Sequence, residues 1–242
     1  MSNESSLTDW SDVTRCPKVS MVINEVPSKS TRATRRRAQS FESLVRAGLS
    51  VIAKHGVYET TVEHITEAAD VGKGTFYAHF PSKDALLHYL VHNGFDEMIA
   101  AGRKESPAGR TPAERLAALI RAQLEVLGRR RDLIILMHQV RGLLILEPRA
   151  RQHLRREFQR YIEFLTEEFH QALRGPHLKN AEARDLACAV AGFISGTLSF
   201  ELLVHSRRRI RKAPQGPIKA FAAGLASRYV SSRRRANGGR PR

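Results

Sequence analysis

Apolar residues recur every three to four positions along most of this chain, which is the spacing of helices that bury one face in a core. The first such stretch covers about 40–54 and ends at His55-Gly56, a common way to end a helix. No stretch convincingly indicates a strand. We therefore predict an all-α protein of about nine helices. After the first, the expected helices cover about 60–69, 73–80, 82–103, 111–128, 132–146, 148–174, 181–206 and 217–229.

Two of these helices, between residues 60 and 84, are short and lie close together in the sequence. The hydroxyl of Thr60 can cap the first helix, and Glu63 can reach back to complete a capping box. Pro81 stops the second helix, and Ser82 caps the next one. Two helices joined by a three- or four-residue turn that contains glycine form a helix-turn-helix, whose second helix can enter the major groove of DNA.

The second of these helices carries polar and cationic side chains that suit contact with DNA. Lys73 can neutralise a phosphate or donate to guanine, and Thr75 can offer a hydroxyl and a methyl group to base edges. Tyr77 and His79 can donate to backbone oxygens, and Gly74 permits a close approach. The residues that we predict to bind DNA are Arg35, Arg36, Arg37, Thr61, Gly72, Lys73, Gly74, Thr75, Tyr77, His79 and Lys83.

Ordered residues across this stretch also carry a family resemblance. They are Thr60-Thr61-Val62, Ile65, Ala68-Ala69, Val71, Lys73-Gly74-Thr75-Phe76-Tyr77, His79-Phe80 and Ser82-Lys83-Asp84-Ala85-Leu86-Leu87, and they resemble the TetR (tetracycline-repressor-like) family of transcriptional regulators. The chain departs from that pattern at Gly72, where a Ser or Thr usually caps the recognition helix, so we expect a weaker helix start. The resemblance implies an N-terminal three-helix helix-turn-helix domain and a C-terminal helical domain that binds a ligand and dimerises.

We divide the chain into four parts: a leader (1–35), the DNA-binding domain (36–88), the effector-binding and dimerisation domain (89–230) and a tail (231–242). The leader is rich in Ser, Thr and charge, and the tail is basic and rich in Gly, so both are predicted to be disordered. The basic segment at 29–37 is either an arm that lies along the minor groove or the phosphates, or a solvated tail.

Composition narrows the partners and the compartment. The formal net charge of +16 and the pI near 10.7 favour a polyanionic partner, although a generally basic proteome gives the same balance. Only two cysteines occur, which fits a reducing cytosol and a cytoplasmic protein. Residues 186–204 are nearly apolar and about long enough to span a bilayer, but Glu201, Thr197 and Ser199 argue against insertion. We therefore predict no membrane partner.

Signs of catalysis or metal binding are weak. His88 and His92 have the four-residue spacing of metal ligands on a helix, but no Cys or carboxylate in the sequence pattern completes a set, so we expect exposed histidines. No phosphate loop, nucleophile motif or paired-carboxylate motif appears. We predict that the chain is not an enzyme and has no cofactor and no metal.

The resemblance implies a ligand pocket in the second domain, and an apolar or aromatic effector would suit the bulky residues there. The predicted lining is Phe95, Met98, Met137, His138, Phe158, Tyr161 and Phe193. A smooth patch of small residues can be filled by the last helix of the same chain or by a second subunit, and the resemblance favours a dimer. The predicted interface residues are Gly192, Gly196, Phe221 and Leu225.

Together these features predict a homodimeric regulator that binds an inverted-repeat operator in double-stranded DNA. We expect a repressor that a small-molecule effector releases from its operator. The alternative is a DNA-binding protein of the same fold that is controlled by a protein partner or by no ligand.

Overall fold

The computed structural model describes residues 32–105, 111–146, 151–173, 178–205 and 213–237, and these ranges contain nine helices and no strand. The prediction of an all-α fold with about nine helices is confirmed. The helices are α2 (Arg32–His55), α3 (Val62–Ala69), α4 (Lys73–His79), α5 (Lys83–Glu105), α6 (Pro112–Gly128), α7 (Arg131–Leu146), α8 (Gln152–Leu173), α9 (Asn180–His205) and α10 (Gln215–Asn237).

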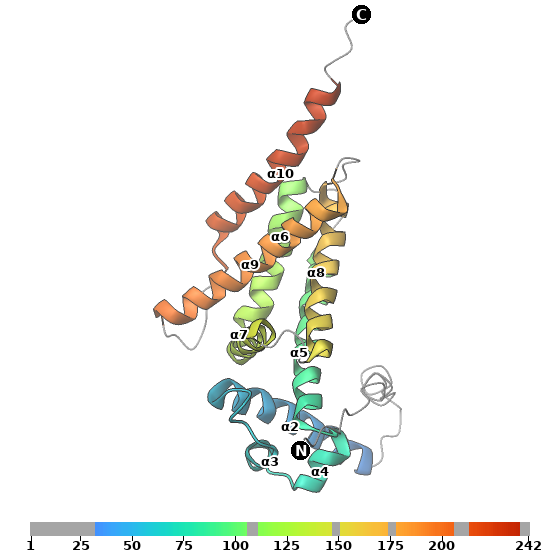
Figure 1. Cartoon of the computed structure of the whole chain (residues 1–242), viewed down its shortest axis with the longest axis vertical. Helices are drawn as coiled ribbons and strands as arrows, with labels where there is room; N and C mark the ends of the chain where they lie inside the picture. The colour runs from blue at the N-terminus through green and yellow to red at the C-terminus, as the bar shows by residue number, and fades with distance from the viewer. Residues whose placement is uncertain (1–31, 106–110, 147–150, 174–177, 206–212, 238–242) are drawn as a thin grey trace, which may run out of the picture.

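Helices α2, α3 and α4 gather at one end of the molecule, and α5 leads from them into the larger group formed by α6 to α10 (Figure 1). The small end has its own buried centre, to which Leu44, Ile65 and Phe76 contribute fully buried side chains. Helices α3 and α4 are each too short to be stable alone in water, so packing against α2 in this core stabilises them.

Both predicted disordered ends are partly helical. Helix α2 begins at Arg32 rather than near Ser40, so the predicted leader includes its first turn, and residues 1–31 lie outside the described ranges. Helix α10 continues to Asn237, which makes the first part of the predicted tail helical, and 238–242 lie outside the described ranges. Both stretches, 32–35 and 231–237, contain Arg and Ala, which have high helix propensity. This propensity outweighs the charge on which the prediction of disorder rested.

The start of α3 differs by one residue from the prediction. Thr61, not Thr60, is the cap: its hydroxyl accepts from the His64 amide at 3.2 Å, and His64 rather than Glu63 completes the capping box. Thr60 is fully buried and donates its hydroxyl to the Gly56 carbonyl at 2.6 Å. Either of two adjacent threonines can cap a helix, and burial of the first selects the second.

Other predicted helix starts are confirmed. The hydroxyl of Ser82 accepts from the Ala85 amide at 3.1 Å at the start of α5. At the start of α6, the hydroxyl of Thr111 accepts from the Glu114 amide at 3.3 Å, and Glu114 accepts from the Thr111 amide at 3.0 Å. Both caps supply acceptors for amides that have no partner inside the helix.

Close packing along α5 joins the two parts of the molecule. A Cβ atom added at Gly94 would lie 2.7 Å from the Leu133 side chain of α7, and one at Gly102 would lie 2.6 Å from the Phe164 ring of α8. Glycine therefore lets α7 and α8 approach α5 closely. Any shift of α7 or α8 is then felt by the helix that begins at the DNA-binding end.

Candidate nucleic-acid interface and ligand cavity

The turn between α3 and α4 is tight because Asp70 adopts a left-handed backbone conformation, with φ 53° and ψ 50°. The Asp70 amide donates back to the Glu67 carbonyl at 3.2 Å, which closes α3. Helix α4 then begins after Gly72, which supplies no side-chain cap, as predicted. Phe76 is fully buried and anchors α4, so the opposite side of this helix faces solvent.

The outward face of α4 carries several of the residues predicted to bind DNA. Lys73, Gly72 and Gly74 are exposed, and Tyr77 is 56% exposed. A Cβ atom at either glycine would meet nothing within 4 Å, so nothing in the described chain covers this surface. Thr75 is half-buried beside them. The geometry leaves a short, open helix face that can approach a groove.

Lys73 already has a partner in the free protein. Its ammonium forms an ion pair with Glu63 of α3, and the hydrogen bond from Lys73 lowers the pKa of Glu63 to about 2. The Lys73 side chain is 57% exposed and that of Glu63 is 50% exposed, so water and salt weaken the pair. A phosphate or a base can therefore compete for Lys73.

Two predicted DNA contacts are directed into the protein instead. His79 Nε2 lies 2.9 Å from the Ser40 hydroxyl and packs edge-on against Phe41, and burial followed by the charge of Arg37 lowers its pKa. The Lys83 ammonium donates to the carbonyls of Val57 at 2.8 Å and Thr60 at 2.6 Å, and lies 3.4 Å from that of Tyr58. The prediction that Lys83 binds DNA, as an anchor on phosphate, is corrected to a structural role, because its donors hold the α2–α3 loop.

The remaining predicted contacts flank α4. Arg35, Arg36 and Arg37 are exposed on α2, which makes them part of a helix rather than an extended arm. Thr61 is exposed at the start of α3, where its hydroxyl is occupied by capping. These side chains add positive charge and polar groups to the surface of the DNA-binding end.

A cavity lies in the larger helical group, with about 570 Å³ of empty space, part of it open to solvent. Six of the seven predicted lining residues surround it, namely Phe95, Met98, Met137, His138, Phe158 and Tyr161. The seventh, Phe193, is not part of the lining and stacks on Phe221 of α10, with ring centroids 4.5 Å apart.

Aromatic rings form one wall of the cavity. Phe95 stacks on Tyr161 and meets Phe158 edge-on, each at 4.9 Å between ring centroids. The buried Tyr161 hydroxyl donates to Gln123 Oε1 at 3.2 Å, and burial raises its pKa. Because the polar end of Tyr161 is satisfied within the protein, its ring is left to contact an apolar ligand.

Arg141 and Ser195 join His138 at the polar end of the cavity, and neither was among the predicted lining residues. Arg141 Nη2 lies 2.7 Å from His138 Nδ1. The available signal was the position of an arginine three residues after a histidine on α7, whose sequence is otherwise largely apolar. A charged residue on such a helix indicates a specific role, because burying a charge without a partner costs free energy.

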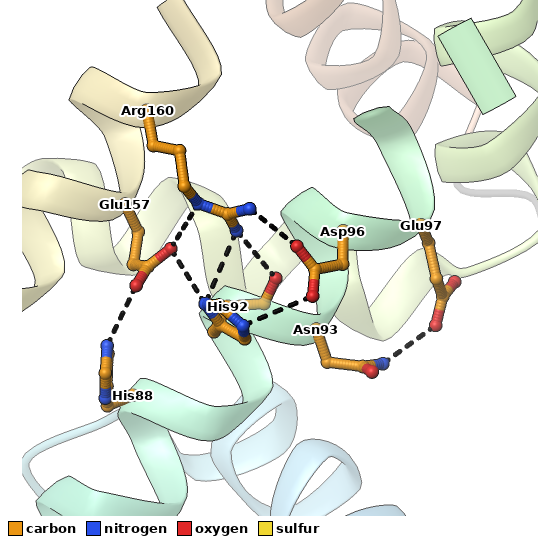
Figure 2. A network of polar contacts seen from close by, with 7 residues as sticks. All are labelled: His88, His92, Asn93, Asp96, Glu97, Glu157 and Arg160. Carbon is orange, nitrogen blue, oxygen red and sulfur yellow. Dashed lines mark hydrogen bonds and ion pairs between the residues drawn. The ribbon is translucent and has the colours of Figure 1, made fainter. Parts of the chain in front are cut away.

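Beside the cavity, a polar network joins α5 to α8 (Figure 2). Glu157 of α8 accepts from His88 Nε2 and His92 Nδ1, each at 3.0 Å, and Arg160 bonds Asp96 at 2.6 Å. The expectation that both histidines are exposed and meet no carboxylate is wrong, because α8 brings Glu157 between them. Within the described ranges, no group of three or more His, Cys, Asp or Glu side chains is arranged to hold a metal ion.

Comparison with known proteins places these features in a family. Residues 44–90, which include α3 and α4, match the family model described as "Bacterial regulatory proteins, tetR family". Residues 44–90 are therefore identified as a DNA-binding domain of the TetR family. The HTH-type transcriptional regulator TcmR of Streptomyces glaucescens is 34% identical over 116 residues, covering 45% of this chain and 50% of the relative. The HTH-type transcriptional repressor KstR2 of Mycobacterium tuberculosis is 26% identical over 106 residues, covering 44% and 53%.

Solved structures extend the similarity beyond the DNA-binding domain, to the fold of most of the chain. The fatty acid degradation regulator FadR of Bacillus halodurans aligns with a TM-score of 0.63 at 19% identity, covering 76% of this chain and 94% of that one. FadR of Bacillus subtilis, solved with stearoyl-CoA, aligns at 0.57 and 20% identity, covering 79% and 98%. The chain spans about half the length of the two curated relatives, and the structural likeness concerns the fold alone.

Among the described residues, one face of α9 is left open. Gly192, Gly196, Phe200 and Leu203 recur at helical spacing, Phe200 is 67% exposed, and Leu203 is 74% exposed. A Cβ atom at either glycine would meet nothing within 4 Å. The described helix α9 is also long and apolar enough, over Asn180–Val204, to pass a length-and-composition test for a membrane span. Its apolar surface is therefore available to a partner of some kind.

Proposed function

We propose that this chain is a sequence-specific DNA-binding transcriptional regulator that represses its genes and is released by a small ligand. The observation that carries the proposal is the open face of α4, with Lys73 and Thr75 on a helix-turn-helix that matches the tetR family model. A short helix with a cation and a hydroxyl near its start suits reading of base edges in the major groove. The name of KstR2 as a repressor supports repression.

The proposed active species is a homodimer built on the open face of α9 together with α10. Two recognition helices related by a two-fold axis read an inverted repeat, with half-site centres about 34–36 Å apart or a multiple of that distance. Exposed apolar groups such as Phe200 and Leu203 need cover, and small residues at 192 and 196 permit a close helix pair. In this proposal a second copy of the chain, and not a lipid bilayer, buries the apolar face of α9.

The proposed effector site is the cavity between α5 and α9, whose apolar and aromatic walls suit an apolar ligand. The bound stearoyl-CoA in FadR of Bacillus subtilis supports a ligand with an apolar chain. Ligand binding can reach the DNA-binding end through α7, because His138 lines the cavity while the next residue, Gln139, donates to the Ile52 carbonyl of α2 at 3.3 Å. The ligand lowers operator affinity if it prefers the conformation that DNA does not.

Reciprocity supplies the test. Duplexes selected from the source genome are titrated with the full chain, with and without a compound shown to bind the cavity. The expected result is that saturating operator weakens compound binding by the same factor by which the compound weakens operator binding. A tight cavity ligand whose affinity does not depend on DNA would overturn release by ligand and favour control by a protein partner or by no ligand.

A further inference from the structure

Arg141 brings a positive charge to a cavity that is otherwise largely apolar. It lines the cavity together with His138 and Ser195, and the same lining includes the aromatic rings of Phe95 and Phe158. The side chain is half-buried, and this burial lowers the pKa of its guanidinium. A cation that has lost part of its hydration gains from a partner of opposite charge.

Within the described ranges, no carboxylate forms an ion pair with Arg141. Arg130, Arg151 and Arg160 each form an ion pair with a carboxylate, whereas among the described residues none pairs with Arg141. Its hydrogen bond goes to His138 Nδ1 at 2.7 Å. The charge of Arg141 is thus held in place by a side chain without being neutralised by one.

The direction of the hydrogen bonds fixes His138 as a neutral ring. A guanidinium has no acceptor, so it donates and His138 Nδ1 accepts, which leaves the ring proton on Nε2. Nε2 then donates to the Ser199 hydroxyl, which in turn donates to the Ser195 carbonyl at 2.5 Å. Burial, followed by the charge of Arg141, lowers the pKa of His138 and keeps it neutral near pH 7. The chain of bonds orients Arg141 and adds no negative charge.

We propose that the ligand of this cavity is an amphipathic anion, with an apolar chain or ring against the aromatic wall and one anionic group bound by Arg141. The inference rests on the proposed function in taking the cavity as the effector site. Carboxylate and phosphate both match the planar, two-pronged donor set of arginine. The aromatic wall accepts the apolar body, as in small-molecule sites that are mostly apolar with a few placed polar groups.

Chain-matched probes test the anionic group. Decanoate, decyl phosphate and decan-1-ol share one apolar chain and differ in their head groups, so calorimetric titration of the full chain isolates the contribution of charge. We expect at least one anion to bind roughly tenfold to a hundredfold more tightly than the alcohol. The order of decanoate and decyl phosphate identifies which anion the site prefers. Equal affinity for all three probes, or binding of none, would overturn the proposal.

Variants locate the effect at Arg141. Arg141→Gln keeps hydrogen-bond donors and removes the charge, so it should abolish the preference for the anion and leave decan-1-ol binding unchanged. Arg141→Lys should restore part of the preference. Arg121→Gln, a half-buried arginine of α6 outside the cavity lining, is the matched control and should bind all probes as the wild type does. An anion preference that survives in Arg141→Gln would show that another group binds the anion.

DNA binding separates this inference from the proposed function. Failure of the full chain to bind any operator would defeat the regulator proposal, while the probe affinities would still decide the ligand class. Conversely, a chain that binds an operator but shows no preference for anions refutes the ligand class alone. Circular dichroism of every variant excludes unfolding as the cause.

Discussion

Among single residues, Lys83 ties the start of α5 to the loop between α2 and α3. Its ammonium donates to carbonyls of Val57 and Thr60, in the loop between α2 and α3. Lys83→Met should therefore lower the free energy of unfolding by about 1–3 kcal/mol, because charged hydrogen bonds to the backbone are lost. The slope of operator affinity against salt should stay unchanged, since no phosphate contact is removed. Thermal melts and titrations at several salt concentrations measure the two effects.

Lys104→Met is the matched control for Lys83, because it removes an exposed lysine far along α5 from α4. It should change neither stability nor salt slope. A Lys83→Met protein that melts like the wild type but loses about one unit of salt slope per subunit would return Lys83 to the role of phosphate anchor.

The polar network between α5 and α8 makes stability depend on pH through His92. The hydrogen bond to Glu157 is the main cause that raises the pKa of His92, although burial opposes it. The folded protein then holds this proton to higher pH than the unfolded chain does, so the added stability is present below the ordinary pKa near 6.5 and is lost as pH rises through the raised value. The stability advantage of wild type over His92→Gln should shrink between about pH 6 and about pH 8.

Neighbouring groups in this network do not mimic the pH effect of His92. Burial opposes the shift of Glu157, yet hydrogen bonds from His88 and His92 hold its pKa well below the usual range, so it stays charged throughout. Burial is the first cause that lowers the pKa of His153, which therefore titrates on the acid side of 6.5 and has the opposite sign. The measurement is the melting temperature of the wild type and of His92→Gln between about pH 6 and about pH 8. A difference that stays constant over this range would contradict the role of His92.

At the scale of elements, α7 connects the cavity to the DNA-binding end. Gln139 Nε2 donates to the Ile52 carbonyl of α2 at 3.3 Å, and its Oε1 is buried without a partner. Gln139→Leu should leave the affinities for ligand alone and for DNA alone within a few-fold of the wild type, because one weak bond is lost and one unpaired oxygen is removed. The factor by which ligand weakens DNA binding should fall towards one. Gln159→Leu, exposed on α8, should keep full coupling.

Elements were more predictable than their polar contacts. Apolar spacing and caps such as Thr111–Glu114 determine helices locally, so the order of the helices could be predicted from the sequence. The roles of Lys83 and His79 depend on partners that lie tens of residues away, such as Val57 for Lys83 and Ser40 for His79. Nothing local distinguishes a lysine that holds a loop from one that awaits a phosphate. The six aromatic, Met and His residues that line the cavity could be predicted from the sequence, because bulky side chains on neighbouring helices converge.

At the scale of the whole molecule, the proposed dimer makes a prediction at Gly196. A Cβ atom there meets nothing within 4 Å in the described chain, so Gly196→Leu should fold as well as the wild type or better, since glycine inside a helix costs up to about 1 kcal/mol. The added side chain should block a second helix from approaching. Sedimentation at micromolar concentration should find a dimer for the wild type and a monomer for the variant, with operator affinity lost.

Gly142→Leu serves as the control for Gly196→Leu. It makes the same change on α7, where a Cβ atom also meets nothing within 4 Å and no interface is proposed. It should remain a dimer. A wild-type monomer, or a Gly196→Leu protein with unchanged mass, would contradict the assignment of α9 to the dimer and leave its apolar face for another partner.

The central claim is that α4 of a dimeric chain reads DNA, and selection of bound duplexes from a random-sequence pool by the full chain tests it most directly. We expect enrichment of one inverted repeat, with half-site centres about 34–36 Å apart or a multiple of that distance. Repeating the selection with Thr75→Ala should relax one position in each half-site, a loss of about 1–3 kcal/mol of discrimination. Reading of DNA by α4 of a dimer would be contradicted if no common sequence is enriched. It would also be contradicted if the selected site is not repeated and Thr75→Ala keeps the same sequence preference.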